Sequence, residues 1–376
     1  MKILQTIASF DSRCGGTSTC TYDLISALHK IGGEVDLLTP NSPNLMGKNE
    51  QWIKAVKNDC ISPYGYSNNI RHYLQNTNYD LYHINGLWLY SNHITCKESR
   101  KKNKPYIITP HGMLYPHALA RSAWKKNIMF KIGGVHNDIK SAACIHVTCK
   151  DELNYIRALG YKNPVALIPN PVPFPKFISE ITQQRDKKRI GFLGRLHPRK
   201  NVDKLIDAWT ILENKYSDAE LIIMGSGDIE YEQFLKKKIK QANIKNVIFT
   251  GFITGQEKFT QLASLTALCV PSEFENFGMI IPEALSVGTP VIASKGTPWE
   301  ELEEYQCGYW VNNSPQSISQ AIENIFSKSN SEILEMGKHG QNLVKQKYSD
   351  IQVAEQMMQL YKWLIYENEK PQFIYE

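Results

Sequence analysis

The feature that most restricts the fold of this chain is a pattern of short apolar runs alternating with longer amphipathic ones. Short β-branched runs separated by helical patterns predict βαβ units, in which helices cover both faces of a parallel sheet. In the first half of the chain, the expected strands are 2–8, 34–39, 80–84, 106–109, 144–147 and 165–168, and the expected helices are 19–30 and 150–159.

A proline-rich segment interrupts this pattern, with prolines at 164, 169, 171, 173 and 175, and a polar stretch follows to residue 188. Proline fixes φ and cannot donate to a strand ladder, so the segment predicts a semi-rigid connector between domains. The pattern then restarts, with expected strands 189–193, 220–224, 247–250, 267–270 and 290–293 and expected helices 202–215, 231–242, 256–263, 282–286, 315–327 and 332–347.

The length of 376 residues also favours two domains, because a single hydrophobic core rarely grows so large. We predict an α/β protein with one Rossmann-like domain over residues 1–176 and another over 177–350. Ligands of such sheets bind beyond the carboxyl ends of the strands, so we expect a binding cleft between the two.

Composition places the chain among folded proteins, with 42% hydrophobic and 21% charged residues. No apolar run approaches the roughly 20 residues that cross a bilayer, and the first ten residues are too polar for a secretory leader. The eight cysteines form no CxxC pair, which argues against a zinc site. We therefore expect a cytoplasmic protein with reduced thiols.

Basic side chains cluster in two places within a modest net charge of +6. Residues 97–104 contain five of them, and the segment 121–132 mixes cations with Trp124, Ile128, Met129 and Phe130. These residues fit solvated helix faces. They also fit an interfacial helix on the inner face of the membrane, bound to anionic lipid. Nucleic acid is not an expected partner, since no motif of such domains occurs.

Several phosphate and metal motifs are absent from the chain. It contains no GxxxxGK[ST] loop, and the GxG at Gly225 lacks the third glycine of a dinucleotide fingerprint. No Asp-x-Asp pair occurs, so the carboxylates of a divalent-metal clamp on a diphosphate are missing. We expect neither a metal nor any other cofactor.

The run 271–288 is the most informative in the chain, since it follows an expected strand and leads into a helix. Glu275 lies in the loop and Glu283 in the first helical turn, eight positions later. The helix dipole explains an acidic residue at the position of Glu283, but it does not explain Glu273 and Glu275 together in one loop. A glycine-containing loop at a helix start suits phosphate, and a carboxylate there can accept hydrogen bonds from ribose hydroxyls.

A second run, 194–201, follows the first strand of the second domain and contains Arg195, Arg199 and Lys200. A solvated turn is one interpretation. The other is an anion clamp, in which Arg195 and Lys200 neutralise the charge on a leaving diphosphate.

Three glycine or histidine positions stand out in the first half. Gly15 and Gly16 follow the first expected strand and precede a helix. His111 follows the strand 106–109, and His83 lies near the end of the strand 80–84. A histidine at a strand end is often structural, but two at neighbouring strand ends also suit a catalytic site, with His111 the stronger candidate.

In these motifs the chain resembles the family-four retaining glycosyltransferases of the GT-B fold, from residue 1 to the last helix. The matching features are the Gly15-Gly16 loop, the His111-Gly112 pair, the Arg195 and Lys200 clamp, and the two spaced glutamates. The glutamates are the most specific of these. Residues 111–116 and 124–126 look like those of members that build surface polysaccharides.

The resemblance implies transfer of a hexosyl or related sugar, with retention and without a metal, from a UDP- or GDP-linked donor to a glycan or polyprenyl-diphosphate-linked acceptor. It implies no side-chain nucleophile, and it places the last helix, about 351–376, on the N-terminal domain. The roles it assigns are as follows: Arg195 and Lys200 hold the donor diphosphate; Glu283 holds the ribose; Glu275, Asn276, Phe277 and Gly278 hold the sugar; His111 faces that sugar from the other domain; Gly15, Gly16 and Gly225 belong to donor-binding loops.

The chain departs from the family pattern at Asn276, where the family has glycine, and the loop 296–300 matches only loosely. Two other functions fit the architecture. A sugar-nucleotide epimerase would need acid and base carboxylates about a sugar carbon. A non-catalytic sugar-binding protein of two domains would be expected to carry an export signal if it were periplasmic.

Overall fold

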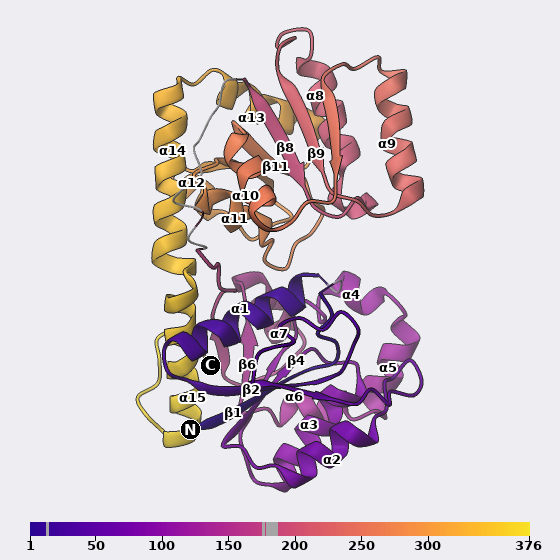
Figure 1. Cartoon of the computed structure of the whole chain (residues 1–376), viewed down its shortest axis with the longest axis vertical. Coiled ribbons are helices and arrows are strands. Elements are labelled where there is room, and N and C mark those ends of the chain that lie inside the picture. The colour runs from indigo at the N-terminus through magenta and orange to yellow at the C-terminus, as the bar shows by residue number, and fades with distance from the viewer. Residues whose placement is uncertain (13–14, 175–176, 178–186) are drawn as a thin grey trace. The chain divides into compact units, whose positions relative to one another are not determined.

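The structure is a computed structural model that describes residues 1–12, 15–174, 177 and 187–376, and these residues form two compact units (Figure 1). The first unit combines Met1–Pro171 with Asp350–Glu376, and the second is Val172–Ser349. The chain enters the second unit before the boundary predicted at residue 176, because the Val172 amide donates to the Tyr348 carbonyl at 2.8 Å. Cys14, Pro175 and most of the polar stretch before residue 188 lie outside the described residues.

The first unit contains an eight-stranded sheet in the order β14-β7-β6-β5-β4-β1-β2-β3. Strand β14 runs antiparallel to β7, and the other pairs are parallel. Parallel pairing follows from the helical crossovers between successive strands. The strands are β1 (Lys2–Ile7), β2 (Glu34–Pro40), β3 (Ile53–Val56), β4 (Leu81–Asn85), β5 (Tyr106–Thr109), β6 (Cys144–Val147), β7 (Val165–Leu167) and β14 (Ile374–Tyr375).

Two apolar layers cover this sheet, one on each face. The layer that includes β1 and α1 also receives Met357, Leu360 and Tyr361 from the C-terminal helix α15, which packs along α1. The other layer is built from α2, α3, α6 and α7. The helices of the first unit are α1 (Gly16–Lys30), α2 (Asn68–Asn76), α3 (Tyr90–Lys101), α4 (Pro116–Ala120), α5 (Ala123–Lys131), α6 (Val135–Lys140), α7 (Lys150–Ala158) and α15 (Asp350–Tyr366).

The second unit repeats the arrangement with a six-stranded parallel sheet in the order β10-β9-β8-β11-β12-β13. Its strands are β8 (Arg189–Leu193), β9 (Glu220–Met224), β10 (Val247–Gly251), β11 (Ala267–Val270), β12 (Val291–Ser294) and β13 (Gly308–Val311). Its helices are η2 (Pro198–Lys200), α8 (Val202–Leu212), α9 (Ile229–Gln241), α10 (Gly255–Ser264), α11 (Ile280–Ser286), α12 (Glu301–Glu304), α13 (Pro315–Phe326), α14 (Asn330–Leu343) and the π-helical turn η3 (Val344–Tyr348). The prediction of an α/β protein with two parallel sheets is therefore confirmed.

The sequence pattern did not predict α3, and the reason lies in its composition. Its inner face buries Ser91, Asn92, Thr95, Glu98 and Ser99, so it shows no apolar stripe of helical period. Thr95 and Ser99 instead bond back to carbonyls one turn earlier, at 2.7 Å each. Small polar residues that satisfy their own hydroxyls can thus line a buried helix face.

Two expectations from composition concern the membrane and the cysteines. Within the described ranges, none of the helices is both long enough and apolar enough to span a bilayer. The seven cysteines in those ranges are free thiols, of which Cys60 is exposed and the others are buried.

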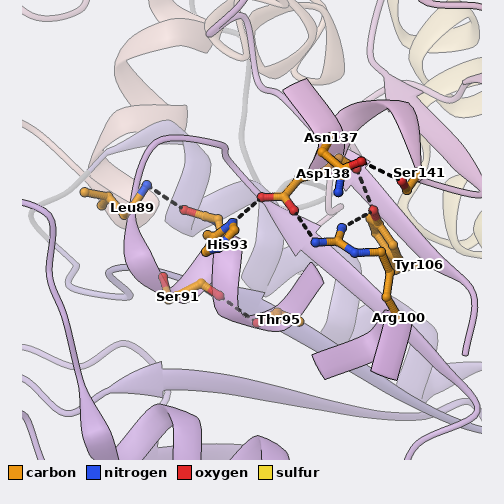
Figure 2. A network of polar contacts seen from close by, with 10 residues as sticks. Leu89, Ser91, His93, Thr95, Arg100, Tyr106, Asn137, Asp138 and Ser141 are labelled. Atoms are coloured by element: carbon orange, nitrogen blue, oxygen red, sulfur yellow. Dashed lines mark hydrogen bonds and ion pairs between the residues drawn. The ribbon is translucent and has the colours of Figure 1, made fainter. Parts of the chain in front are cut away.

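The basic run 97–104 does not form one solvated face. Arg100 turns inward, where its guanidinium donates to Asp138 Oδ1 and to the Tyr106 hydroxyl, both at 2.8 Å (Figure 2). His93 Nδ1 lies 2.6 Å from Asp138 Oδ2, and the Tyr106 hydroxyl donates to the Asp138 carbonyl at 2.6 Å. This network connects α3, β5 and α6 around a carboxylate that is only 5% exposed.

We expect Asp138→Ala to lower the free energy of unfolding by about 3 kcal/mol, because it leaves the Arg100 guanidinium without its carboxylate and removes the partner of His93 Nδ1. Chemical denaturation measures the change. Asp207→Ala is the matched control, since it removes an ion pair of similar length, 2.7 Å to Lys238, at a carboxylate that is 43% exposed. That control should cost less than about 1 kcal/mol, and equal losses in both variants would contradict the assignment.

Candidate functional site

Both sheets reverse their strand order at one point, between β1 and β4 in the first unit and between β8 and β11 in the second. Loops that leave neighbouring strands at such a point run in opposite directions, and the space beyond the carboxyl ends is where ligands of open α/β sheets bind. Most of the residues selected from the sequence lie in the loops that leave these four strands or their neighbours, or in the first turn of the helix that follows; His83 is an exception.

The loop after β8 presents the two cations of the predicted anion clamp. Arg195 is exposed, and among the residues with described positions it has no ion-pair partner. Lys200 ends the short helix η2, and its ammonium group forms an ion pair with Glu275 Oε1. The structure therefore brings together one predicted cation and one predicted glutamate that are 75 residues apart in the chain.

The loop after β11 carries the first of the spaced glutamates. Ser272 Oγ donates to Glu275 Oε1 at 2.7 Å, and the Glu275 amide donates to the Gly296 carbonyl at 2.9 Å. The Glu273 amide donates in turn to the Arg199 carbonyl at 2.8 Å, which joins this loop to the one after β8. Glu275 is thus held at its carboxylate and at its backbone, whereas the Glu273 side chain is exposed.

Glu283 lies in the first turn of α11 and pairs with a lysine that the sequence analysis missed. Lys258 Nζ, from α10, lies 2.7 Å from Glu283 Oε1, and both side chains are largely buried. No sequence motif distinguishes Lys258 from the other lysines of the chain. The pairing depends on α10 packing against α11. Pro282, expected to open this helix, is its third residue, and Gly288 follows its end with φ of 75°.

The motif residues 276–278 shape the start of α11. The Phe277 ring is buried against Trp299 and Tyr348, and the Trp299 indole N–H donates to the Phe277 carbonyl at 2.5 Å. Gly278 has φ of 80°, which a residue with a side chain rarely adopts. Only the backbone at Phe277 is therefore suited to contact a ligand, because its ring belongs to the core.

Gly225 has a packing role that explains its GxG pattern. A Cβ atom at Gly225 would lie 1.9 Å from the Gly194 carbonyl oxygen, and one at Gly227 would lie 2.3 Å from the Leu196 carbonyl oxygen. The loops after β8 and β9 are therefore in direct backbone contact, with Leu196 N donating to Ser226 O at 3.1 Å. Glycine at these positions permits the close approach that shapes the Arg195 loop.

The glycine pair in the first unit stands at the start of α1. Gly15 has φ of 79°, and Gly16 is the first residue of the helix. No side chain caps the helix, and no described atom lies within 4 Å of the place where either Cβ would be. Both glycines are exposed at this helix start, and their role in a phosphate loop stays a prediction.

His111 follows β5 in a left-handed conformation, with φ of 51°. Its Nε2 lies 2.9 Å from Asn85 Oδ1, and the Gly112 amide donates to Glu152 Oε1 at 2.5 Å. Burial, with a smaller effect from His146, lowers the pKa of His111 to about 3, so the ring is neutral near pH 7. This turn is thus fixed on one side by an amide and on the other by a buried carboxylate.

His83 differs from the position that the sequence suggested. It lies in the middle of β4 and is fully buried, where it contacts Tyr361 and Thr109. Of the two histidines singled out, only His111 stands in a loop at the carboxyl ends of the strands. In the part of the chain that the structure describes, no group of three or more His, Cys, Asp or Glu side chains is arranged to hold a metal.

Comparison with known families covers most of the chain. Residues 14–174 match the model described as Glycosyltransferase Family 4, and residues 174–343 match the model described as Glycosyl transferases group 1. The chain belongs to the family-four glycosyltransferases. The resemblance drawn from the spaced glutamates and the Arg195 clamp is therefore confirmed at the level of the family.

Curated relatives match over part of their length. An uncharacterised glycosyltransferase of Methanocaldococcus jannaschii is 31% identical over 191 residues, which is 50% of this chain and 47% of the relative. A GDP-mannose-dependent α-(1-6)-phosphatidylinositol dimannoside mannosyltransferase of Mycobacterium tuberculosis is 32% identical over 136 residues, 36% of this chain and 34% of the relative. The chain thus spans about half or less of these relatives.

Solved structures show that the fold is that of the GT-B glycosyltransferases. A sucrose-phosphate synthase of Thermosynechococcus elongatus superposes with a TM-score of 0.77 at 20% identity, covering 98% of this chain and all of the other. The Anabaena protein HepE in complex with UDP has a TM-score of 0.77 at 19% identity, covering 96% of this chain and 99% of the other.

We expect Gly296→Ala to destabilise the second unit by about 2 kcal/mol, because its Cβ would lie 2.2 Å from the Glu273 carbonyl oxygen and displace the glutamate loop. Gly16→Ala is the matched control, since neither glycine has a positive φ and the space around Gly16 is open. It should change stability by less than about 1 kcal/mol. Thermal unfolding of both variants tests this, and a tolerated Gly296→Ala would show that the two loops do not approach as described.

Proposed function

We propose that this protein is a retaining glycosyltransferase that moves a sugar from a nucleoside diphosphate donor to a glycan or lipid-linked acceptor during surface polysaccharide synthesis. The observation that carries the proposal is the geometry at the β8/β11 reversal. The loops after β8 and β11 present the exposed Arg195 and the Lys200–Glu275 pair, and the helix α11 that follows β11 carries Glu283, paired with Lys258 of α10. Such a set can bind an anion and several hydroxyl groups at once.

The ion pair between Lys200 and Glu275 suggests how the donor enters. A diphosphate beside Arg195 would attract the Lys200 ammonium group, which is 28% exposed and can turn toward it. Glu275 would then keep the hydrogen bond from Ser272 and gain capacity to accept from the hydroxyls of the donor sugar. In the free protein, Lys200 and Glu275 compensate each other's charge. On binding, the donor diphosphate would take the place of Glu275 beside Lys200, and the sugar hydroxyls would take the place of Lys200 beside Glu275.

Glu283 would accept hydrogen bonds from the ribose hydroxyls. The ion pair with Lys258 occupies one carboxylate oxygen and fixes its direction, which leaves the other oxygen for the ribose. The ammonium of Lys258 also lies 4.6 Å from the centre of the Phe259 ring, so it is held from two sides.

Catalysis in this proposal depends on charge and position. Arg195 and Lys200 would stabilise the negative charge that develops on the leaving diphosphate. The acceptor would attack from the same face as the leaving group, and the departing phosphate oxygen would take its proton. No protein nucleophile is required, and His111 would contact the donor sugar.

The names of relatives support the choice of donor. HepE binds UDP and, in another structure, UDP-glucose, while two of the curated relatives are named as GDP-mannose-dependent enzymes. We therefore propose a UDP- or GDP-linked sugar, bound without a metal.

Thermal stability in the presence of UDP, GDP, ADP, TDP or CDP, each with and without EDTA, tests the nucleotide site. A diphosphate at 100 times its dissociation constant should add about 2.7 kcal/mol to the folded state. We expect one nucleotide to act, with no effect of EDTA, and the shift to disappear in Glu283→Ala.

Glu220→Ala serves as the control for that experiment. Glu220 is also ion-paired and is 15% exposed, as Glu283 is, but it stands at the amino end of β9, away from the site. It should keep the nucleotide shift. The absence of a shift with every nucleotide in the unmodified protein would overturn the proposed function.

We also propose that α5 rests on anionic membrane. Trp124, Ile128 and Ile132 follow one another at helical spacing and are 66%, 48% and 83% exposed. Lys125 and Lys131 are exposed beside them, and the same helix borders a hollow lined by Lys126 and His136. Apolar side chains next to cations suit the boundary between lipid tails and anionic head groups.

Vesicles with and without an anionic lipid test this proposal. We expect the double variant Trp124→Ser, Ile128→Ser to bind anionic vesicles at least tenfold more weakly, because two apolar side chains no longer leave water. Lys125→Glu should weaken binding further at low salt. Lys126 is a poorer choice, since its ammonium group donates to the Ala118 carbonyl.

Ile211→Ser with Phe252→Ser is the control, because these side chains in the second unit are 54% and 76% exposed. Equal binding by both double variants would exclude α5 as the membrane contact.

A further inference from the structure

A continuous chain of hydrogen bonds crosses the sheet of the first unit and ends at His111. It joins side chains of β1, β4, β5, β6 and α15, all of them buried except His111. The contacts are His146 Nε2 to the Ile168 carbonyl at 2.8 Å, His146 Nδ1 to Thr109 Oγ1 at 2.8 Å, Thr109 Oγ1 to His83 Nε2 at 2.6 Å, His83 Nδ1 to the Tyr361 hydroxyl at 2.8 Å, Tyr361 to Gln5 Nε2 at 3.0 Å, Gln5 Oε1 to Asn85 Nδ2 at 3.0 Å, and Asn85 Oδ1 to His111 Nε2 at 2.9 Å.

The contact between His146 and the Ile168 carbonyl determines which group donates in each of these hydrogen bonds. A carbonyl oxygen only accepts, so His146 Nε2 must carry a proton and donate to Ile168. Burial lowers the pKa of His146 to about 4, so the ring is neutral and its Nδ1 has no proton. Thr109 must then donate its single hydroxyl proton to His146 Nδ1.

The same argument assigns the donors and acceptors at Thr109, His83 and Tyr361. Because the Thr109 proton is already used, His83 Nε2 must donate to the Thr109 oxygen. Burial lowers the pKa of His83 well below its usual value, so this ring is also neutral and its Nδ1 accepts. The Tyr361 hydroxyl therefore donates to His83 and accepts from the Gln5 amide nitrogen.

The last two steps determine the proton of His111. With its nitrogen turned toward Tyr361, Gln5 presents its oxygen to Asn85, and so the Asn85 nitrogen donates to it. The Asn85 oxygen then faces His111 Nε2, which must be the donor. Among the residues whose positions are described, no hydrogen-bond partner lies at His111 Nδ1.

We propose that this directed chain holds His111 as the Nε2-protonated tautomer, with Asn85 and Tyr361 as its positioning residues. The inference bears on function only through the proposed contact between His111 and the donor sugar. His111 Nδ1 would present a lone pair, so it would accept a hydrogen bond from a sugar hydroxyl and could not donate one. The C-terminal helix, through Tyr361, thereby sets the chemistry of a loop that follows β5.

Reversal of the chain would be costly at every step. In the opposite tautomer, His111 Nε2 would carry no proton to donate to Asn85 Oδ1. If the Asn85 amide rotated to donate to His111 instead, its oxygen would face the Gln5 oxygen. A buried polar atom left without its partner costs about 1–3 kcal/mol. Hydrogen bonds that run in one direction also polarise one another, which favours a single arrangement.

Nitrogen NMR of the full chain labelled with ¹⁵N-histidine tests the proposal directly. The His111 signals, identified by their loss in His111→Gln, should show a protonated Nε2 and an unprotonated Nδ1 near pH 7. Tyr361→Phe should abolish this preference and give a mixture of tautomers. If Tyr361→Phe does not fold, the isosteric variant Thr109→Val replaces it and is expected to have the same effect.

Tyr82→Phe is the matched control. Tyr82 lies next to His83 in β4 and is fully buried, but its hydroxyl has no hydrogen-bond partner in the part of the chain that the structure describes. This variant also loses a buried hydroxyl and should leave the His111 tautomer unchanged. A proton on Nδ1 in the unmodified protein, or equal effects of Tyr361→Phe and Tyr82→Phe, would overturn the proposal.

Asn85→Asp adds a readout through catalysis. A carboxylate would still accept from His111 Nε2, so the tautomer should persist, but the negative charge should raise the pKa of His111. Burial, His146 and the nearby His83 all oppose a proton on His111, and the new carboxylate would act against these effects. Glu152 contacts the same turn through the Gly112 amide. The acid limb of the transfer rate should therefore move to higher pH.

These measurements separate the two proposals. The tautomer is measured on the free protein, so an absence of sugar transfer would count against the proposed function and leave the NMR result intact. An unchanged acid limb in an active Asn85→Asp variant would show that His111 does not act through Asn85.

Discussion

The parallel arrangement of strands is the constraint on which the rest of this structure depends. Every parallel strand delivers its loop to the same edge of its sheet, and the reversal of strand order separates two such loops to make room for a ligand. In the second unit this brings Lys200 next to Glu275, although 75 residues lie between them. Each charge compensates the other, since a partly buried charge without a partner would destabilise the fold.

Glycine and short polar side chains make these loops stiff. Gly225, Gly227 and Gly296 allow backbone to touch backbone where a single Cβ would collide with a carbonyl. Ser272 then completes the site by a hydrogen bond to Glu275. Loops assembled this way keep their backbone geometry without a ligand, which would reduce the reorganisation that binding requires.

Two networks of buried polar groups in the first unit pair their donors with acceptors. The series of hydrogen bonds that runs from the Ile168 carbonyl to His111 and the Asp138 network both connect elements that are distant in sequence. Helix α15 contributes Tyr361 to the first of them. Because such groups are costly to leave unpaired, their pairing fixes side-chain orientation more firmly than apolar packing does. A remote helix can thus influence a loop through hydrogen-bond direction alone.

The sequence by itself determined the α/β class, the two parallel sheets, the family, and most of the residues at the carboxyl ends of the strands, because strand period and loop motifs are local properties. It could not show α3, whose buried face is polar, nor Lys258 and Tyr361, which belong to no motif. It also placed His83 near a strand end, where the structure buries it within the sheet. Partners of a charge and the direction of a hydrogen-bond chain depend on which distant segments pack together, and only the tertiary structure decides that.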